Sequence, residues 1–216
     1  MSKRKRNLII AIFLTVLSII YTLCVKFIDV KKIGPNNSNV GFSTINNCFK
    51  KMIGSNMNLY KLTEILGYIA ILIACTYALI GLIQFIKRKS IFKVDKEIIL
   101  LGFFYAIVVL IYIFFEKCII NYRPIIIDNE LEASFPSSHT LLALCICTSS
   151  IIISKKYINK KYIKFTNIAT ILLMLGVLFG RLFSGVHWLS DIIGGIIISI
   201  TLITYFIYAY GFIRKH

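Results

Sequence analysis

The chain has 216 residues, of which 58% are hydrophobic and 16% charged, and its formal net charge is +16 at pH 7. A soluble domain contains closer to half apolar residues, so this composition argues against an ordinary soluble protein. So basic a charge is typical of nucleic-acid binding, but these positive residues stand where a membrane protein needs them, which excludes a nucleic-acid partner.

Six apolar runs follow one another along the chain, most of them long enough to cross the hydrocarbon layer as a helix. We therefore predict an all-α, polytopic membrane protein with six transmembrane helices, in which residues 1–216 form a single domain. The fourth run is the shortest, and its ends are the least defined. The predicted spans are Leu8–Ile28, Leu62–Ile86, Ile98–Phe115, Thr140–Ile153, Phe165–Phe179 and Ile192–Ile213.

Residues 29–61 form a long polar connection after the first span. Its first part, Ile33–Asn39, is rich in turn-forming residues. Its second part, Phe49–Tyr60, mixes lysines with apolar side chains. That mixture suits either a short helix lying at the membrane interface or a solvated loop with a few buried anchors.

Lysine and arginine are concentrated in alternate connections, where 16 of the 25 occur. Because basic connections remain in the cytoplasm, we expect both termini there, in a protein of the cell membrane. The connections after the third and fifth spans are then expected on the outside. The four basic segments are Lys3–Arg6, Lys87–Lys96, Lys155–Lys164 and Arg214–Lys215.

Two short polar motifs flank the connection between the third and fourth spans. Arg123-Pro124 follows the third span, where the arginine either anchors the helix at the interface or binds an anion. Pro136-Ser137-Ser138-His139 opens the fourth span. Free N–H groups at that helix start, with the hydroxyls of Ser137 and Ser138, make an anion pocket in which His139 could protonate a bound group. An ordinary helix cap is the alternative.

The third motif, Arg181…His187…Asp191, lies between the fifth and sixth spans. A histidine and an aspartate four residues apart share one helix face, so the carboxylate could hold the imidazole in one tautomer. Arg181 offers a planar, permanent cation for a phosphate. A simple pairing of His187 with Asp191 at a helix start is the alternative.

Together the three motifs predict phosphoryl chemistry at the outer face. Two arginines and a helix N-terminus would neutralise phosphate oxygens as charge redistributes in the transition state. One histidine would attack the phosphorus, and the other would give a proton to the leaving alkoxide.

The three motifs resemble the signature of the type 2 phosphatidic acid phosphatases, which share a fold with bacterial acid phosphatases and vanadium haloperoxidases. The family pattern is Lys-x6-Arg-Pro, then Pro-Ser-Gly-His, then Ser-Arg-x5-His-x3-Asp. Here Ser138 replaces the glycine, Gly180 replaces the serine, and Glu116 occupies the lysine position, with Lys117 as the next residue. The resemblance covers the chain from the third span to the end.

By this resemblance, His187 is the nucleophile that becomes phosphorylated, Asp191 orients it, and His139 is the general acid that later activates water. The resemblance implies that neither a metal nor another cofactor is needed. The residues expected to hold the phosphate are Arg123, Arg181, Ser137, Ser138 and Lys117.

We therefore expect an integral-membrane lipid phosphatase, a metal-independent hydrolase that removes a terminal phosphate from a phospholipid or an isoprenoid diphosphate through a phosphohistidine. Its partner would be a phosphorylated membrane lipid. Glu116 motivates one alternative, a non-catalytic lipid-phosphate binding or transport protein on the same fold. A second alternative treats His139, His187 and Asp191 as a metal site. The sequence leaves open the lipid and the oligomeric state.

Overall fold

A computed structural model of the chain describes residues 3–127 and 129–213. These residues form seven α-helices, six of which are long and apolar enough to cross a membrane, so the six predicted spans are confirmed. The basic segment Arg214–Lys215 lies outside the described residues. The spans are α1 (Lys3–Phe27), α3 (Met57–Arg88), α4 (Lys96–Lys117), α5 (Ser138–Tyr157), α6 (Ile163–Ser184) and α7 (Leu189–Ile213).

All six spans extend beyond their apolar runs at one or both ends by a few residues, because polar end residues can still join the helix. α3 shows this most clearly. The side chain of Asn56 accepts a hydrogen bond of 3.0 Å from the N–H of Leu59, which caps a helix that begins five residues before the predicted Leu62. The short fourth run becomes a full helix, α5, in the same way.

The connection after α1 folds into a small hairpin and a helix. Strand β1 (Lys31–Lys32) pairs antiparallel with β2 (Asn39–Val40), and the 3₁₀ turn η1 (Pro35–Asn37) joins them, as the turn-rich sequence predicts. Helix α2 (Ser43–Ile53) follows. The helix alternative over Phe49–Tyr60 is thus only partly right. Its second half belongs to α3, because the chain breaks at Gly54, where φ is +66°.

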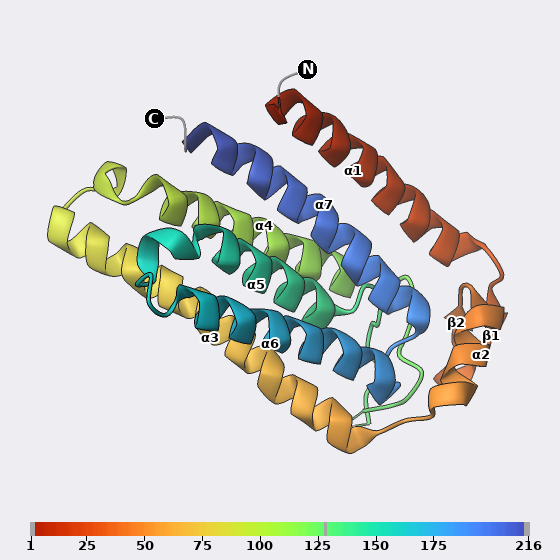
Figure 1. The fold of residues 1–216 in the computed structure, drawn as a ribbon. Coiled ribbons are helices and arrows are strands. Elements are labelled where there is room, and N and C mark those ends of the chain that lie inside the picture. Colours follow the sequence, from red (N-terminus) through yellow and green to blue (C-terminus); the bar gives the residue numbers. More distant parts are fainter. Residues whose placement is uncertain (1–2, 128, 214–216) are drawn as a thin grey trace.

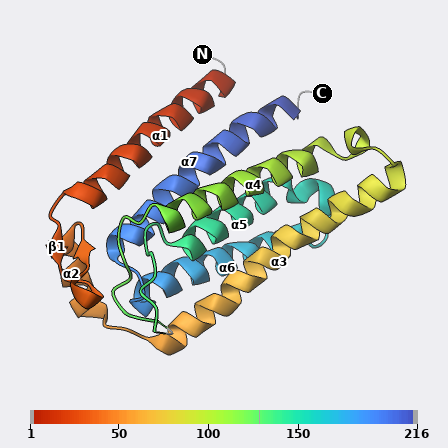
Figure 2. The same cartoon turned by 180° about the vertical axis from the view of Figure 1, so that it is seen from behind.

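The six long helices run side by side, and the functional motifs gather at one end of the bundle (Figures 1 and 2). We call this the motif end. It contains residues 28–56, the 118–137 loop and the 185–188 turn. The opposite end, which we call the basic end, contains the start of α1, the end of α7 and two lysine-rich connections, one of which includes η2 (Ile91–Lys93).

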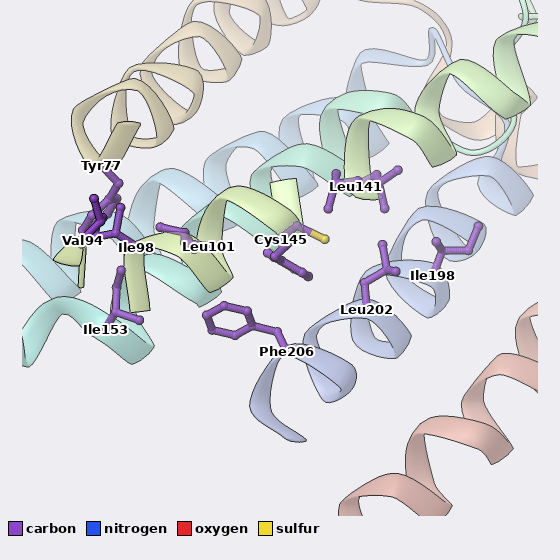
Figure 3. Close-up of a cluster of buried hydrophobic side chains, with 12 residues drawn as sticks. Tyr77, Val94, Ile98, Leu101, Leu141, Cys145, Ile153, Ile198, Leu202 and Phe206 are labelled. Carbon is purple, nitrogen blue, oxygen red and sulfur yellow. The ribbon is translucent and has the colours of Figure 1, made fainter. Parts of the chain in front are cut away.

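The apolar core lies between α4, α5 and α7, with Tyr77 contributed by α3 (Figure 3). Leu101, Leu141 and Phe206 bring these helices together with almost no exposed surface. α5 has the largest buried fraction of the described helices, with ten of its 20 residues buried against ten of 25 in α7. It therefore sits at the centre of the bundle, which fixes the position of its first turn.

α1 packs mainly along α7 (Figure 2). Hydroxyl groups hold the two helices together. Thr15 Oγ1 lies 3.1 Å from Tyr205 Oη, and Ser18 Oγ lies 2.9 Å from Thr201 Oγ1. Tyr21 donates a hydrogen bond of 3.0 Å to the carbonyl of Ser190. In an apolar environment such directional bonds fix the register of the two helices more firmly than side-chain packing alone.

Candidate active site

All three polar motifs meet at the motif end of the bundle (Figure 1). A small cavity of about 10 Å³ lies there, lined by residues of the second and third motifs. The 118–137 loop, the first turn of α5 and the turn before α7 close this cavity, and the end of α4 forms its remaining wall. His187 reaches into it. The lining residues are Tyr112, Phe115, Glu116, Ala133, Phe135, Pro136, Ser138, Leu141 and His187.

His187 is held by one ring nitrogen and leaves the other free. Its Nδ1 lies 3.0 Å from the carbonyl oxygen of Ser134, so the proton on Nδ1 is donated to that oxygen. Its Nε2 is buried and has no hydrogen-bond partner among the described residues. Burial, together with the positive charges of Arg123 and Arg181, holds the pKa of His187 well below its usual range. The ring is therefore neutral, with a lone pair on Nε2.

His187 and Asp191 lie close together, as expected, but no direct hydrogen bond joins them. Their nearest atoms, Nδ1 and Oδ2, are 3.9 Å apart, too far for a hydrogen bond. The reason is that α7 begins only at Leu189, so His187 precedes the helix and shares no helix face with Asp191. Asp191 instead accepts a hydrogen bond of 2.9 Å from the N–H of Trp188, as an acid in the first turn of a helix does.

Asp191 acts on His187 through the loop. Its carboxylate accepts a short hydrogen bond from Ser134 Oγ and a longer one, 3.3 Å, from Asn121 Nδ2. The N–H of Ser134 in turn donates to the carbonyl of Asn121 at 2.9 Å. Asp191 thus fixes the residue whose carbonyl holds the His187 ring.

His139, on the first turn of α5, shows the same arrangement with the nitrogens exchanged. Its Nε2 lies 3.3 Å from Oε1 of Glu64, a residue of α3. Its Nδ1 is buried and has no partner within the described part of the chain. One nitrogen is therefore anchored, and the other is available to a bound group.

The two arginines are each anchored by one carboxylate. Arg181 is fully buried and forms an ion pair through Nη2 with the same Oε1 of Glu64, while its guanidinium lies 4.8 Å from the ring centre of Tyr60. Arg123 pairs through Nη2 with Glu132 at 2.9 Å. Arg123 is therefore buried in a folded loop and does not serve as an exposed interface anchor.

Four side chains thus leave buried nitrogen atoms without hydrogen-bond partners in residues 3–127 and 129–213. Unsatisfied buried polar atoms are costly in a folded protein, and a group of them that includes two guanidinium cations indicates a missing ligand of opposite charge. Guanidinium groups in particular match the oxygens of a phosphate. The atoms are Nε and Nη1 of Arg123, Nε and Nη1 of Arg181, Nδ1 of His139 and Nε2 of His187.

Of the remaining predicted phosphate ligands, Ser138 lines the cavity. Ser137 is the N-cap residue of α5 and is completely buried, but its hydroxyl bonds to Thr140 at 3.0 Å and does not cap the helix. Lys117 is exposed at the end of α4 and does not line the cavity, whereas Glu116 does. The structure therefore places Glu116, and not Lys117, at the cavity that Ser138 lines.

Residues 28–56 brace the site from outside. Asn46 of α2 accepts a hydrogen bond of 3.1 Å from the N–H of Ser190, next to Asp191. Lys50 donates to the carbonyl of Gly185 at 2.6 Å, two residues before His187. Gly185 itself has φ +67°, and a Cβ there would lie 2.0 Å from the carbonyl oxygen of Gly54. The turn that carries His187 can therefore approach α2 this closely only with glycine at that position.

The sequence interpretation missed the anchoring residues Glu64, Glu132, Ser134 and Asn121. For Glu64 a signal existed, because it is the only acidic residue inside any of the six predicted spans. An ionisable residue within a span indicates function by default. The other three lie in a polar loop, where nothing in the sequence distinguishes them from their neighbours.

The alternative of a metal site finds no ligand set in the described residues, which contain no group of three His, Cys, Asp or Glu side chains placed to hold a metal ion. His139 and His187 are each tied to a different anchor, and the free atoms around them belong to two cations. This arrangement suits an anion.

Comparison with known proteins agrees with the resemblance seen in the motifs. Residues 114–215 match the PAP2 superfamily. The fold is similar to the crystal structure of the first transmembrane PAP2 type phosphatidylglycerolphosphate phosphatase from Bacillus subtilis, with a TM-score of 0.62 and 19% sequence identity, over 95% of this chain and 96% of that one. No curated protein matches the chain in sequence. At this identity the structural match establishes the fold.

Proposed function

We propose, from the match of residues 114–215 to the PAP2 superfamily and from the arrangement of the site, that the chain is a lipid phosphatase that works through a phosphohistidine. The substrate would be a phospholipid phosphate or an isoprenoid diphosphate, with its tail among the spans and its phosphate beside the two arginines and the two histidines. The observation that carries the proposal is the group of unpartnered nitrogen atoms on Arg123, Arg181, His139 and His187.

In the first step, the lone pair of His187 Nε2 attacks phosphorus while the bond from phosphorus to the leaving oxygen breaks. His139 gives its proton to that oxygen, so the product leaves as an alcohol rather than as an alkoxide. A diphosphate substrate would release a lipid monophosphate instead. Arg123 and Arg181 stabilise the charge on the phosphate oxygens during the transfer.

In the second step, water attacks the phosphorus of the phosphohistidine and gives its proton to His139. The phosphorus–nitrogen bond breaks, inorganic phosphate departs, and Nε2 regains its lone pair. Every step uses groups present in this chain, and the two cationic guanidinium groups provide the charge neutralisation. We therefore propose that the hydrolysis needs no metal.

The test is phosphate release by the purified full chain in lipid micelles. The panel contains phosphatidic acid, phosphatidylglycerol phosphate and an isoprenoid diphosphate. H187A should reduce turnover to background, a loss of about 10⁴-fold or more, and should abolish the phosphohistidine trapped from labelled substrate. H216A, which changes the remaining histidine, is the matched control and should behave as the unmodified chain does. Binding without phosphate release from any of the lipids would instead support the non-catalytic alternative.

We also propose that the motif end faces the outside of the cell membrane. Ten of the Lys and Arg residues that support this orientation lie in the α3–α4 and α5–α6 connections or in the adjoining helix ends, at the basic end. Cys48 and Cys118 are free, exposed and at the motif end. A membrane-impermeant thiol reagent should label both in intact cells, with C48S and C118S as controls. Labelling of these two cysteines only after lysis would reverse the orientation.

A further inference from the structure

Glu64 contacts two residues that the proposed reaction uses for different purposes. Its atom Oε1 contacts both Nη2 of Arg181 and Nε2 of His139, so one carboxylate joins a predicted phosphate ligand to the predicted general acid. The residue lies two turns into α3, a helix that precedes residues 114–215, which match the PAP2 superfamily. Nothing in the three motifs assigns it a role.

The face of α3 around Glu64 is shaped for these contacts. Gly67, almost one turn further along, faces the His139 ring, and a Cβ at that position would lie 2.6 Å from Cδ2 of His139. Tyr60, one turn earlier, presents its ring to the Arg181 guanidinium. Residues three and four apart share one helix face. The same face of α3 therefore presents the ring of Tyr60, the carboxylate of Glu64 and, at Gly67, a position without a side chain.

Glu64 does not take the place of the phosphate. It occupies Nη2 of Arg181 and leaves Nε and Nη1 of that residue without partners in the described chain. Likewise it occupies Nε2 of His139 and leaves Nδ1 unpartnered. A carboxylate near membrane depth is costly, and an ion pair with Arg181 alone would not require the second contact with His139.

We propose that Glu64 is a positioning residue for proton transfer: it holds the His139 ring through Nε2 so that Nδ1 serves the leaving oxygen. The inference rests on the proposed phosphatase function and adds a residue from the second span to it. The carboxylate acts through His139 and does not touch the substrate. Arg181, paired with the same oxygen, keeps the carboxylate in place while the proton moves.

The decisive experiment compares two esters, because only one of them needs an acid. An alkyl phosphate releases a poor leaving group that must be protonated, whereas a nitrophenyl phosphate releases a stable phenolate. E64A should lower kcat for the alkyl ester by about 10–100-fold and for the nitrophenyl ester by less than about 3-fold, with KM nearly unchanged. H139A should show the same pattern with a larger loss.

A purely structural role for Glu64 makes a different prediction. Loss of folded protein would lower the turnover of both esters by one factor, and this result would overturn the assignment. E64Q keeps the size of the side chain and one acceptor oxygen, so it should lie between E64A and the unmodified chain. E97Q provides the matched control, because Glu97 pairs with Lys156 at 2.7 Å at the basic end, and it should change neither ester.

A double-mutant cycle tests whether Glu64 acts through His139. In the H139A background, E64A should cost almost nothing further with the alkyl ester, whereas independent effects would multiply. Independent losses of the same size in both backgrounds would refute the proposal. If the unmodified chain turned over neither ester, the phosphatase function itself would fail.

A measurement without turnover separates these two failures. The chain has three histidines, so ¹⁵N-histidine labelling yields three ring spectra that H139A and H187A assign. E64A should shift the Nε2 signal of His139 and leave that of His187 in place. An unchanged His139 signal would show that Glu64 does not hold the ring, whatever the activity of the chain.

Discussion

The candidate active site has two sides, and each side holds its functional groups by different means. The helix side consists of Arg181 and His139, both anchored by Glu64 of α3. The loop side consists of Arg123 and His187, anchored by residues of the 118–137 loop. The anchoring carboxylate is more enclosed on the helix side, since the side chain of Glu64 is 24% exposed and that of Glu132 is 39% exposed.

The difference indicates that packed helices fix one side and backbone hydrogen bonds fix the other. On the loop side, the N–H of Arg123 bonds to the carbonyl of Glu132 at 3.0 Å, next to the link between Ser134 and Asn121. An ion pair with an exposed carboxylate adds little to such a scaffold, whereas breaking an enclosed pair leaves a charge with no partner. Matched substitutions on the two sides should therefore have unequal effects.

The largest expected contrast is between the two arginines. R181A should lower kcat/KM by about 10³-fold, because it removes a phosphate donor and also leaves Glu64 without its cation. R123A should lower it by about 10²-fold. Phosphate release with one lipid substrate measures both. If R123A were the more damaging variant, the loop side would be the principal phosphate clamp and the comparison would be reversed.

D191N tests how the loop side is held together. The carboxylate accepts hydrogen bonds from Trp188, Ser134 and Asn121, and an amide would turn one acceptor oxygen into a donor facing these groups. We expect a loss of about 10–100-fold in kcat and a lower Tm. Because Asp191 acts on the nucleophile, alkyl and nitrophenyl esters should lose activity alike, in contrast to E64A. A selective loss with the alkyl ester would argue that Asp191 serves the helix side.

The pH dependence of kcat/KM sharpens the assignment of the nucleophile. Protonation of His187 removes the lone pair, so activity falls as pH drops through its pKa. Because burial and the neighbouring arginines lower that pKa, the acid limb attributable to His187 should lie well below the usual value of about 6.5. R123A removes one of those charges and should move the limb upward. A limb near 6.5 that R123A leaves in place would contradict the assignment.

The smallest effects should come from the outermost charges. E132Q should change kcat/KM by less than about 5-fold, because the backbone bond of Arg123 remains. K117A should be nearly silent, since Lys117 is exposed and away from the cavity. A loss of tenfold or more in K117A would show that this residue replaces the lysine expected at position 116.

The sequence predicted the six spans well, because a membrane helix satisfies its own backbone hydrogen bonds and so leaves a continuous local pattern. It also selected the two histidines and the two arginines that the structure brings together at the motif end. It failed where the contact joins distant segments, as between Glu64 and His139. It failed as well where a helix boundary moved, since the capping role of Asp191 starts α7 after His187 and not before it.

The hydroxyl contacts between α1 and α7 have a consequence for the whole motif end. Thr15, Ser18 and Tyr21 fix the position of α1 along α7, and thereby the point at which α1 ends and the hairpin and α2 begin. One inserted residue between Ser18 and Tyr21 would rotate the end of α1 by about 100° and raise it by about 1.5 Å. Asn46 would then lose its hydrogen bond to Ser190 in the first turn of α7. The spacing of residues in the first membrane helix therefore affects the orientation of His187, more than 160 positions away along the polypeptide.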